Sequence, residues 1–461
     1  MPLKPIATAA ALLGLILLAS CGGSGSGSTL APPPATYTVG GTVSGLVAGT
    51  SLTLTDNGSD ATVVSASGSF TFTGRIAEGG SYSVAVSTQP VAQDCAVTNA
   101  SGSGVAANVG NVTVACTARQ QYAYVLNNGL NSISEYQIGS DGRLSNPHLL
   151  APVPTGSSPE TITVDPSRHF LYVTNLNDNT VSQYRIQSDG TLLPNTPATV
   201  AVGNGPNGFA IDPAGKYAYV VCTTDQTVTQ YSIGSNGTLT KTAATAVLTG
   251  VHPWDISVTP DDKYVYVTDH GTGLVGGTTL EQYAVASDGS LSALTPATVT
   301  TDAYPTGHAV DASGTHLYVA NAGTDAVSQY SIGSDGQLAA LVPATVPGGS
   351  QPDFIAIHPS GKFAYAPNFT PGTTTQPAGT VSQYAIATDG TLSALPGASP
   401  ATGLGPVWLS FDAFGRYAYV INLTMGTVSE YSVGIDGTLS LMVEAALAGP
   451  NGQPYAMAIA Y

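Results

Sequence analysis

Seven short segments of this 461-residue chain begin with a proline, and the residue after the proline differs in each. Those seven positions hold Glu160, Asn207, Trp254, Thr306, Asp353, Val407 and Tyr455. A carboxylate near a bound carbonyl can act as a general base toward attacking water, so Glu160 and Asp353 are the candidate catalytic residues. The oxygens of Glu160, Asn207 and Asp353 could instead hold Ca²⁺, the only cofactor that the sequence suggests.

The other side chains of these segments favour ligand binding. Asn207, Trp254, Asp255, Trp408 and Tyr455 are polar or aromatic, a set suited to a neutral sugar, a peptide or a cation. We predict that they form a ring around one binding pocket. The residues that do not agree between repeats are the informative ones, because a purely structural ring would be uniform.

His308 is a third candidate catalytic residue. It fills a position that is apolar in the other segments, so we expect either a general base or a hydrogen-bonded core histidine. His270 lies beside Asp269 but has no second histidine at metal-ligand spacing in the sequence. No transition-metal site is therefore predicted.

These segments belong to a repeat. The second Tyr of "YAYV" or its equivalent recurs seven times between Tyr124 and Tyr419, mostly every 47 or 48 residues, and an Asp-Gly or Asn-Gly turn follows each time. Each unit has four strand signals, labelled A to D along the repeat, which at this period is typical of a β-propeller blade. The array begins with a B strand and ends with an unmatched A strand, Pro454–Tyr461, so we expect the last strand to complete the first blade.

The motifs "YVTN" (Tyr172–Asn175), "TVSQY" and "SDGTL" resemble those of the YVTN-repeat and seven-bladed lactonase family, which includes 6-phosphogluconolactonases. The resemblance covers about three quarters of the chain and implies a seven-bladed propeller over residues 119–461. It also implies lactone hydrolysis. The Pro-Arg-His element of those lactonases is absent from all seven A strands, however, and a phosphorylated sugar would need such a cation.

The N-terminal part predicts export. An apolar run, Ile6–Ala19, leads into the motif Leu18-Ala19-Ser20-Cys21, with which it shares Leu18 and Ala19. This motif resembles the lipobox of bacterial lipoproteins. We therefore expect a signal peptide (residues 1–20), a lipidated Cys21 with a Gly/Ser/Pro tether (residues 21–35), membrane attachment through that lipid and location in the outer membrane, on its periplasmic or outer surface. Residues 36–118 read as a small immunoglobulin-like β-sandwich, with a disulfide between Cys95 and Cys116.

Composition excludes some partners. The chain carries 28 Asp and Glu against 11 Lys and Arg, so nucleic acid is not expected. We predict an all-β, monomeric envelope lipoprotein. Its propeller either binds a neutral or cationic ligand, such as an envelope protein, peptide or glycan, or opens an unphosphorylated sugar-type lactone.

Overall fold

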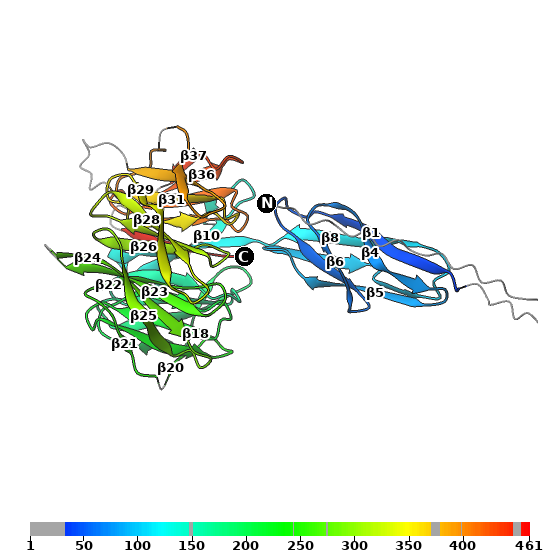
Figure 1. Ribbon diagram of the computed structural model, residues 1–461, viewed down its shortest axis with the longest axis horizontal. Coiled ribbons are helices and arrows are strands. Elements are labelled where there is room, and N and C mark those ends of the chain that lie inside the picture. The colour runs from blue at the N-terminus through cyan, green and yellow to red at the C-terminus, as the bar shows by residue number, and fades with distance from the viewer. Residues whose placement is uncertain are drawn as a thin grey trace, which may run out of the picture.

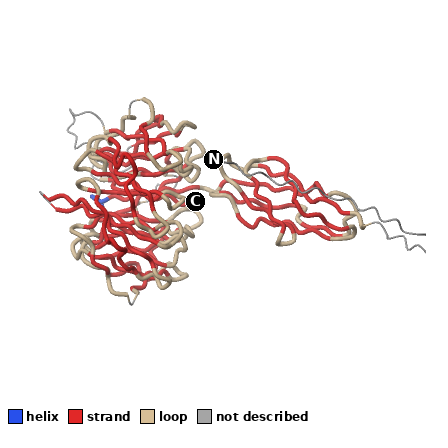
Figure 2. The backbone as a smooth tube through the Cα atoms, in the orientation of Figure 1, coloured by secondary structure: helices blue, strands red, loops and turns tan. Residues whose placement is uncertain are grey.

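A computed structural model describes residues 33–146, 151–242, 244–272, 275–369, 379–397, 399–445 and 453–461. Nearly all regular structure in these ranges is strand, as Figure 2 shows, with one short 3₁₀ helix, η1 (Asn128–Leu130). No helix among the described residues is long and apolar enough to span a bilayer. Cys21 and the expected signal peptide lie outside these residues.

The N-terminal part is a sandwich of two four-stranded sheets. The first contains β4 (Gly68–Ala77), β1 (Thr36–Ser44), β8 (Val109–Ala118) and β6 (Gln93–Thr98), and the second β3 (Asp60–Val64), β2 (Leu52–Asp56), β5 (Ser81–Thr88) and β7 (Ser101–Ser103). Inward-facing Val, Leu and Phe side chains form one core between the sheets. The predicted disulfide between Cys95 and Cys116 is present and joins β6 to β8.

The remaining strands form seven blades, each a four-stranded antiparallel sheet, two of them with a short extra strand. Blade 1 contains β38 (Pro454–Ala460), β9 (Gln121–Asn127), β10 (Ser132–Ile138), β11 (Leu144–Ser145) and β12 (Val153–Pro154). Blade 2 contains β13 (Pro159–Val164), β14 (Phe170–Asn175), β15 (Thr180–Ile186) and β16 (Leu192–Ala201). Blade 3 contains β17 (Pro206–Ile211), β18 (Tyr217–Cys222), β19 (Thr227–Ile233), β20 (Leu239–Lys241) and β21 (Val247–Leu248).

Blades 4 to 7 follow the same order from the axis outward. Blade 4 contains β22 (Pro253–Val258), β23 (Tyr264–Thr272), β24 (Val275–Val285) and β25 (Leu291–Thr300). Blade 5 contains β26 (Pro305–Val310), β27 (His316–Asn321), β28 (Ala326–Ile332) and β29 (Leu338–Pro347). Blade 6 contains β30 (Ala356–Ile357), β31 (Phe363–Asn368), β32 (Thr380–Ile386) and β33 (Leu392–Ala394). Blade 7 contains β34 (Pro406–Phe411), β35 (Tyr417–Asn422), β36 (Thr427–Val433) and β37 (Leu439–Ala445).

Ring closure follows the prediction. The last strand, β38, pairs with β9, so the two ends of the array share blade 1 and neither strand is left as an open edge. β23 and β24 form a longer hairpin than the corresponding strands of the other blades, because β23 continues past Asp269 to Thr272 and β24 begins at Val275.

The repeated residues of the motif link each blade to the next. The hydroxyl of Tyr172 donates to the carbonyl of Gly237, 2.7 Å away in the next blade, and Tyr419 of blade 7 reaches Gly142 of blade 1 at the same distance. All seven motif tyrosines make this bond and are fully buried. The YVTN tyrosine and the Asp-Gly turn therefore act together, through this hydrogen bond, to align neighbouring blades.

Cys222 takes the place of the Asn that ends the second strand of most blades. Cys222 is fully buried, with its sulfur 3.8 Å from the hydroxyl of Thr229. Burial raises the pKa of this thiol, so it remains a thiol at neutral pH and is a packing residue.

The sandwich lies against the face of the propeller where the chain ends (Figure 1). Sandwich residues Thr50 and Gln89 line one crevice together with Ser360 and Phe414, which follow the inner strands of blades 6 and 7. Figure 1 shows the C-terminus in the same place, between the two parts. We call this face the bottom. The opposite, top face, where every inner strand begins, is not covered by the sandwich.

Candidate functional site

The seven inner strands start at the top face around the propeller axis. Their first prolines pair with the last residues of the second strands, as in Pro159 with Asn175 and Pro406 with Asn422. Directly after most of these prolines the register shifts, for example between Pro159 and Ile162. The two side chains that follow the proline therefore both lie near the axis, where the regular alternation of a strand would send one of them away.

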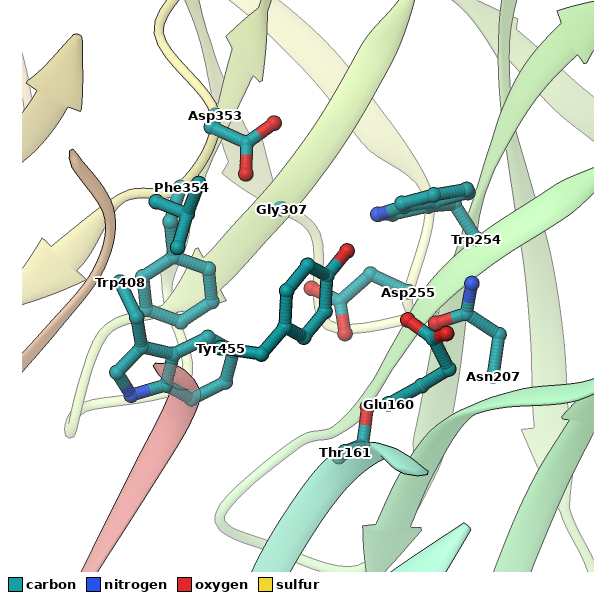
Figure 3. Close-up of a pocket in the computed structure, with 11 residues that line it drawn as sticks. Glu160, Thr161, Asn207, Trp254, Asp255, Gly307, Asp353, Phe354, Trp408 and Tyr455 are labelled. Carbon is teal, nitrogen blue, oxygen red and sulfur yellow. The ribbon is translucent and has the colours of Figure 1, made fainter. Parts of the chain in front are cut away.

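These side chains enclose one cavity, with about 400 Å³ of space including its open mouth (Figure 3). The cavity is lined by Glu160, Thr161, Asn207, Trp254, Asp255, Gly307, Asp353, Phe354, Val407, Trp408 and Tyr455. Every predicted ligand-binding residue and both candidate carboxylates line it.

Three lining residues, Thr161, Gly307 and Phe354, were not predicted. All are the second residue after the proline, so the register shift is the reason they face the cavity. The side chain of Thr306, expected in the ring, instead donates to the carbonyls of Ala320 (3.1 Å) and Pro352 (3.2 Å). Asp255 and Trp408 are also the second residue after a proline. Their polar and aromatic side chains were the signal in the sequence that this position faces the axis.

Glu160 lies half-buried on the wall formed by β13. Its Oε1 accepts a hydrogen bond from Nδ2 of Asn128 at 3.2 Å, and its carboxyl is hydrogen-bonded to the Tyr455 hydroxyl. Burial raises the pKa of Glu160 to about 7, although the hydrogen bonds from Asn128 and Tyr455 act to lower it. Near neutral pH this carboxyl can therefore take or give a proton.

Asp353 lies across the cavity from Glu160. Burial raises its pKa to about 7 as well, and no side chain among the described residues donates to its carboxylate. Tyr455 stands between Asp353 and Glu160 (Figure 3). Burial and the two negative charges raise the pKa of Tyr455, so its hydroxyl stays protonated.

Asp255 connects the cavity to His308. One carboxylate oxygen of Asp255 accepts a hydrogen bond from the backbone N–H of His308 at 3.0 Å and lies 3.3 Å from Nδ1 of its ring. The other ring nitrogen, Nε2, is 2.7 Å from the Ser257 hydroxyl. The His308 side chain is fully buried and does not line the cavity, so of the two predicted roles the structure matches the hydrogen-bonded core histidine.

Two aromatic walls complete the cavity. Trp408 stacks on Phe354 with ring centres 4.0 Å apart, and its indole N–H donates to the Ser410 hydroxyl and the Met457 carbonyl, both at 3.0 Å. Trp408 thus offers a ligand only an apolar surface. Trp254 stands opposite, with its indole nitrogen on the side of the ring that faces Tyr455 (Figure 3).

Charge at the site is negative or absent. The lining includes three carboxyl groups and no Lys, Arg or His. A phosphate dianion would therefore meet carboxylates and no cationic partner. Within the described ranges no three His, Cys, Asp or Glu residues are grouped so as to hold a metal ion, and the proposed Ca²⁺ ligands include only two carboxylates.

His270 has a histidine neighbour in space although the sequence places none at metal-ligand spacing. The ring of His252, which precedes Pro253, lies 5.8 Å from it, and Trp254 and Tyr304 also pack against His270. The 17 residues between the two histidines hid this contact in the sequence, because it joins the segment before β22 to the end of β23 at the top of the same blade.

Comparisons with known proteins agree with this fold. The closed ring resembles the crystal structures of a candidate 6-phosphogluconolactonase of Bacteroides fragilis (18% identity, TM-score 0.63, 74% of this chain and 98% of that one), the periplasmic gluconolactonase PpgL of Pseudomonas aeruginosa (18%, 0.60, 74% and 99%) and a candidate 6-phosphogluconolactonase of Bacteroides uniformis (17%, 0.61, 74% and 99%). At such identities the likeness concerns the fold. No curated protein matches this chain in sequence.

The model of the family described as "Lactonase, 7-bladed beta-propeller" matches residues 64–348 and 336–456. These matches span most of the chain and include the inner strands of blades 2 to 7 and the start of β38, with the residues that line the cavity. The chain therefore belongs to the seven-bladed β-propeller lactonase family.

Proposed function

We propose that this protein hydrolyses an unphosphorylated sugar-type lactone in the top cavity. The observation that carries the proposal is a pair of carboxyl groups, Glu160 and Asp353, which both have a pKa of about 7 and face one small cavity without a cationic side chain. Membership of the lactonase family supports hydrolysis over the binding or scaffolding role that the sequence also allowed.

The two carboxyl groups suit different steps. Donors from Asn128 and Tyr455 stabilise the ionised form of Glu160, so Glu160 is the general base that takes a proton from the attacking water. Asp353 has no such donors among the described residues, so its protonated form is favoured and it is the acid that protonates the departing ring oxygen.

The developing oxyanion needs hydrogen-bond donors. The indole N–H of Trp254 and the amide of Asn207 both face the cavity and can supply them (Figure 3). Asp255, held by its contacts with His308, leaves a further acceptor for the hydroxyl groups of a sugar. A neutral, hydroxyl-rich lactone fits this set of donors and acceptors.

A pH-stat assay tests the proposal. Glucono-1,5-lactone should be opened faster than its spontaneous hydrolysis, and 6-phosphogluconolactone should be a much poorer substrate. Glu160→Gln should lower kcat/KM by about 10²-fold or more, the usual loss of a general base. Asp436→Asn, in a bottom-face turn, is the matched carboxylate control and should leave activity unchanged.

The assay also separates the alternatives. Activity lost with EDTA and restored by Ca²⁺ would replace the carboxylate mechanism with a metal-dependent one. Tight binding of a sugar without turnover of any lactone would support the binding-module alternative.

We also propose that the chain is an envelope lipoprotein, anchored in the outer membrane through Cys21. The disulfide between Cys95 and Cys116 supports an oxidising compartment. Mass spectrometry of the mature protein should find an N-terminal Cys21 that carries lipid, and Cys21→Ser should release the protein from membranes. An unmodified N-terminus upstream of Cys21 would contradict this.

A further inference from the structure

Four aromatic side chains form a continuous row that starts at the cavity and runs outward over blades 4 and 5. Trp254 stacks with His252 at 5.7 Å between ring centres and packs against His270 at 5.0 Å. His270 in turn lies 5.4 Å from Tyr304. Trp254 belongs to the cavity wall and Tyr304 does not, so the row leads from the cavity onto the top surface.

Two of these rings occupy strained backbone positions. In all seven blades the residue before the first proline of the inner strand has a positive φ. In blades 3 and 7 this residue is a glycine, Gly205 and Gly405 respectively. His252 (φ 57°) and Tyr304 (φ 54°) adopt the same left-handed conformation with bulky side chains. Ser158, Gln351 and Gln453 share this left-handed conformation at the same position, so the turn itself sets it and thereby holds the two rings at the top surface.

A groove runs along the far end of the row. It has about 850 Å³ of space including its open side and is lined by His270, Tyr304, Ala322, Gly323, Asp325, Ser350 and Gln351. The extended hairpin of β23 and β24 borders it: a Cβ atom at Gly276 would come within 2.8 Å of the Tyr304 ring. The hairpin is thus packed closely against this ring.

The groove suits an uncharged, hydroxylated ligand. Asp325 is its only carboxylate, and one of its oxygens already accepts a hydrogen bond from the backbone N–H of Gln351 at 2.7 Å. Burial lowers the pKa of His252 and of His270, so both rings are neutral at neutral pH and act as aromatic surfaces with hydrogen-bonding edges. Apolar ring faces beside a few polar groups are the composition of a small-molecule site.

We propose that this groove binds the glycosyl units attached to the lactone ring, so that the natural substrate is the lactone of an oligosaccharide-derived sugar acid. The proposal rests on the lactonase function proposed above. With the lactone ring against Trp254, the next sugar along the chain lies over His270 and Tyr304, where the C–H face of a pyranose ring can pack on an aromatic ring. Ser350 and Gln351 then lie beside its hydroxyl groups.

Kinetics test the groove with a variant that should fold. Tyr304→Gly places at this position the residue that blades 3 and 7 use, so it relieves the left-handed strain while removing the ring. For cellobionolactone and maltobionolactone we expect kcat/KM to fall at least tenfold in Tyr304→Gly and in His270→Ala, through a higher KM. For glucono-1,5-lactone kcat/KM should stay within twofold. Ser158→Gly, the same backbone position in blade 2, is the matched control and should change neither substrate.

A binding experiment separates the groove from catalysis. Isothermal titration of the wild-type protein with the unreactive sugars cellobiitol and maltitol should detect binding of at least one, weakened tenfold or more in Tyr304→Gly. If no lactone is turned over but this pattern of binding holds, the lactonase proposal fails and the sugar groove stands. If glucono-1,5-lactone is hydrolysed and Tyr304→Gly alters both classes of lactone equally, or alters neither, the groove proposal is overturned.

Discussion

Replacing Asp353 by Asn should stabilise the propeller, and the gain should depend on pH. In the unfolded chain an aspartate ionises at its ordinary pKa, 3.8, whereas burial raises the pKa of Asp353 in the folded protein to about 7. Between these values the folded state holds a proton that the unfolded state has lost. Stability of the wild-type protein must therefore fall as pH rises through this window, and it stops falling above about pH 7.

The magnitude follows from the shift. Each unit of pKa difference corresponds to about 1.4 kcal/mol, so between pH 5 and pH 7 the Asp353 carboxyl destabilises the fold by up to about 3 kcal/mol. Asp353→Asn removes that contribution. The free energy of unfolding of the variant relative to wild type should rise by up to about 3 kcal/mol from pH 5 to pH 8.

Thermal unfolding of both proteins at pH 5, 6, 7 and 8 measures this difference. Comparison with wild type at each pH cancels the effect of other groups, including Asp269, whose pKa burial beside Glu281 also raises to about 7. Asp389→Asn is the matched control: hydrogen bonds from Thr391 lower the pKa of this exposed carboxyl, so the substitution should not stabilise the protein at any of these values. A stability difference for Asp353→Asn that is the same at pH 5 and pH 8 would refute a buried, proton-binding carboxyl at this site.

Three further predictions concern the site and the ring. The pH profile of kcat/KM should be bell-shaped with both limbs near pH 7, because activity needs Glu160 ionised and Asp353 protonated. Asp353→Asn should remove the alkaline limb. A flat profile across pH 6 to 8 would contradict the assignment of the two roles. His308→Ile, which installs the residue type of blades 2, 4 and 6, should fold with an unchanged Tm but lower kcat/KM about tenfold, because Asp255 keeps the backbone N–H of residue 308 and loses the ring; unchanged kinetics would make His308 a packing residue only. Deleting residues 454–461 should expose the edge of β9 and yield aggregates in size-exclusion chromatography, and a monomeric product would show that closure by β38 is dispensable.

Much of the fold could be read from the sequence because the repeat encodes it in local signals. The Tyr and Gly positions of each unit recur at one period, and in the structure they form the same interblade hydrogen bond, as between Tyr124 and Gly190. The unmatched A strand at the C-terminus likewise predicted the pairing of β38 with β9. These features depend on short-range patterns and on the need to close an edge.

The site could be predicted only as far as the repeat aligned its positions. Alignment brought Glu160, Asn207 and Asp353 to one ring, but it did not show that the register shift after the proline adds a second side chain from the same strand, such as Phe354. Nor could it show the raised pKa values, since these depend on how much water the surrounding side chains displace. The contact between His252 and His270 was invisible for a similar reason: it joins loops that no strand pattern aligns.

The contrast between the two faces indicates how such a repeat can acquire a site. At the bottom face the turns are nearly identical, because each Gly carbonyl must meet the tyrosine of the preceding blade, as with Gly237 and Tyr172. The residues that follow the inner-strand prolines share no such repeated bond: Thr306 and Trp408 donate to the next blade and Asp255 accepts from it, each with a different partner. They are therefore free to differ, and the axis brings all seven together. Chemistry in this fold is expected where the repeats disagree and the geometry converges, which is the cavity that holds Glu160 and Asp353.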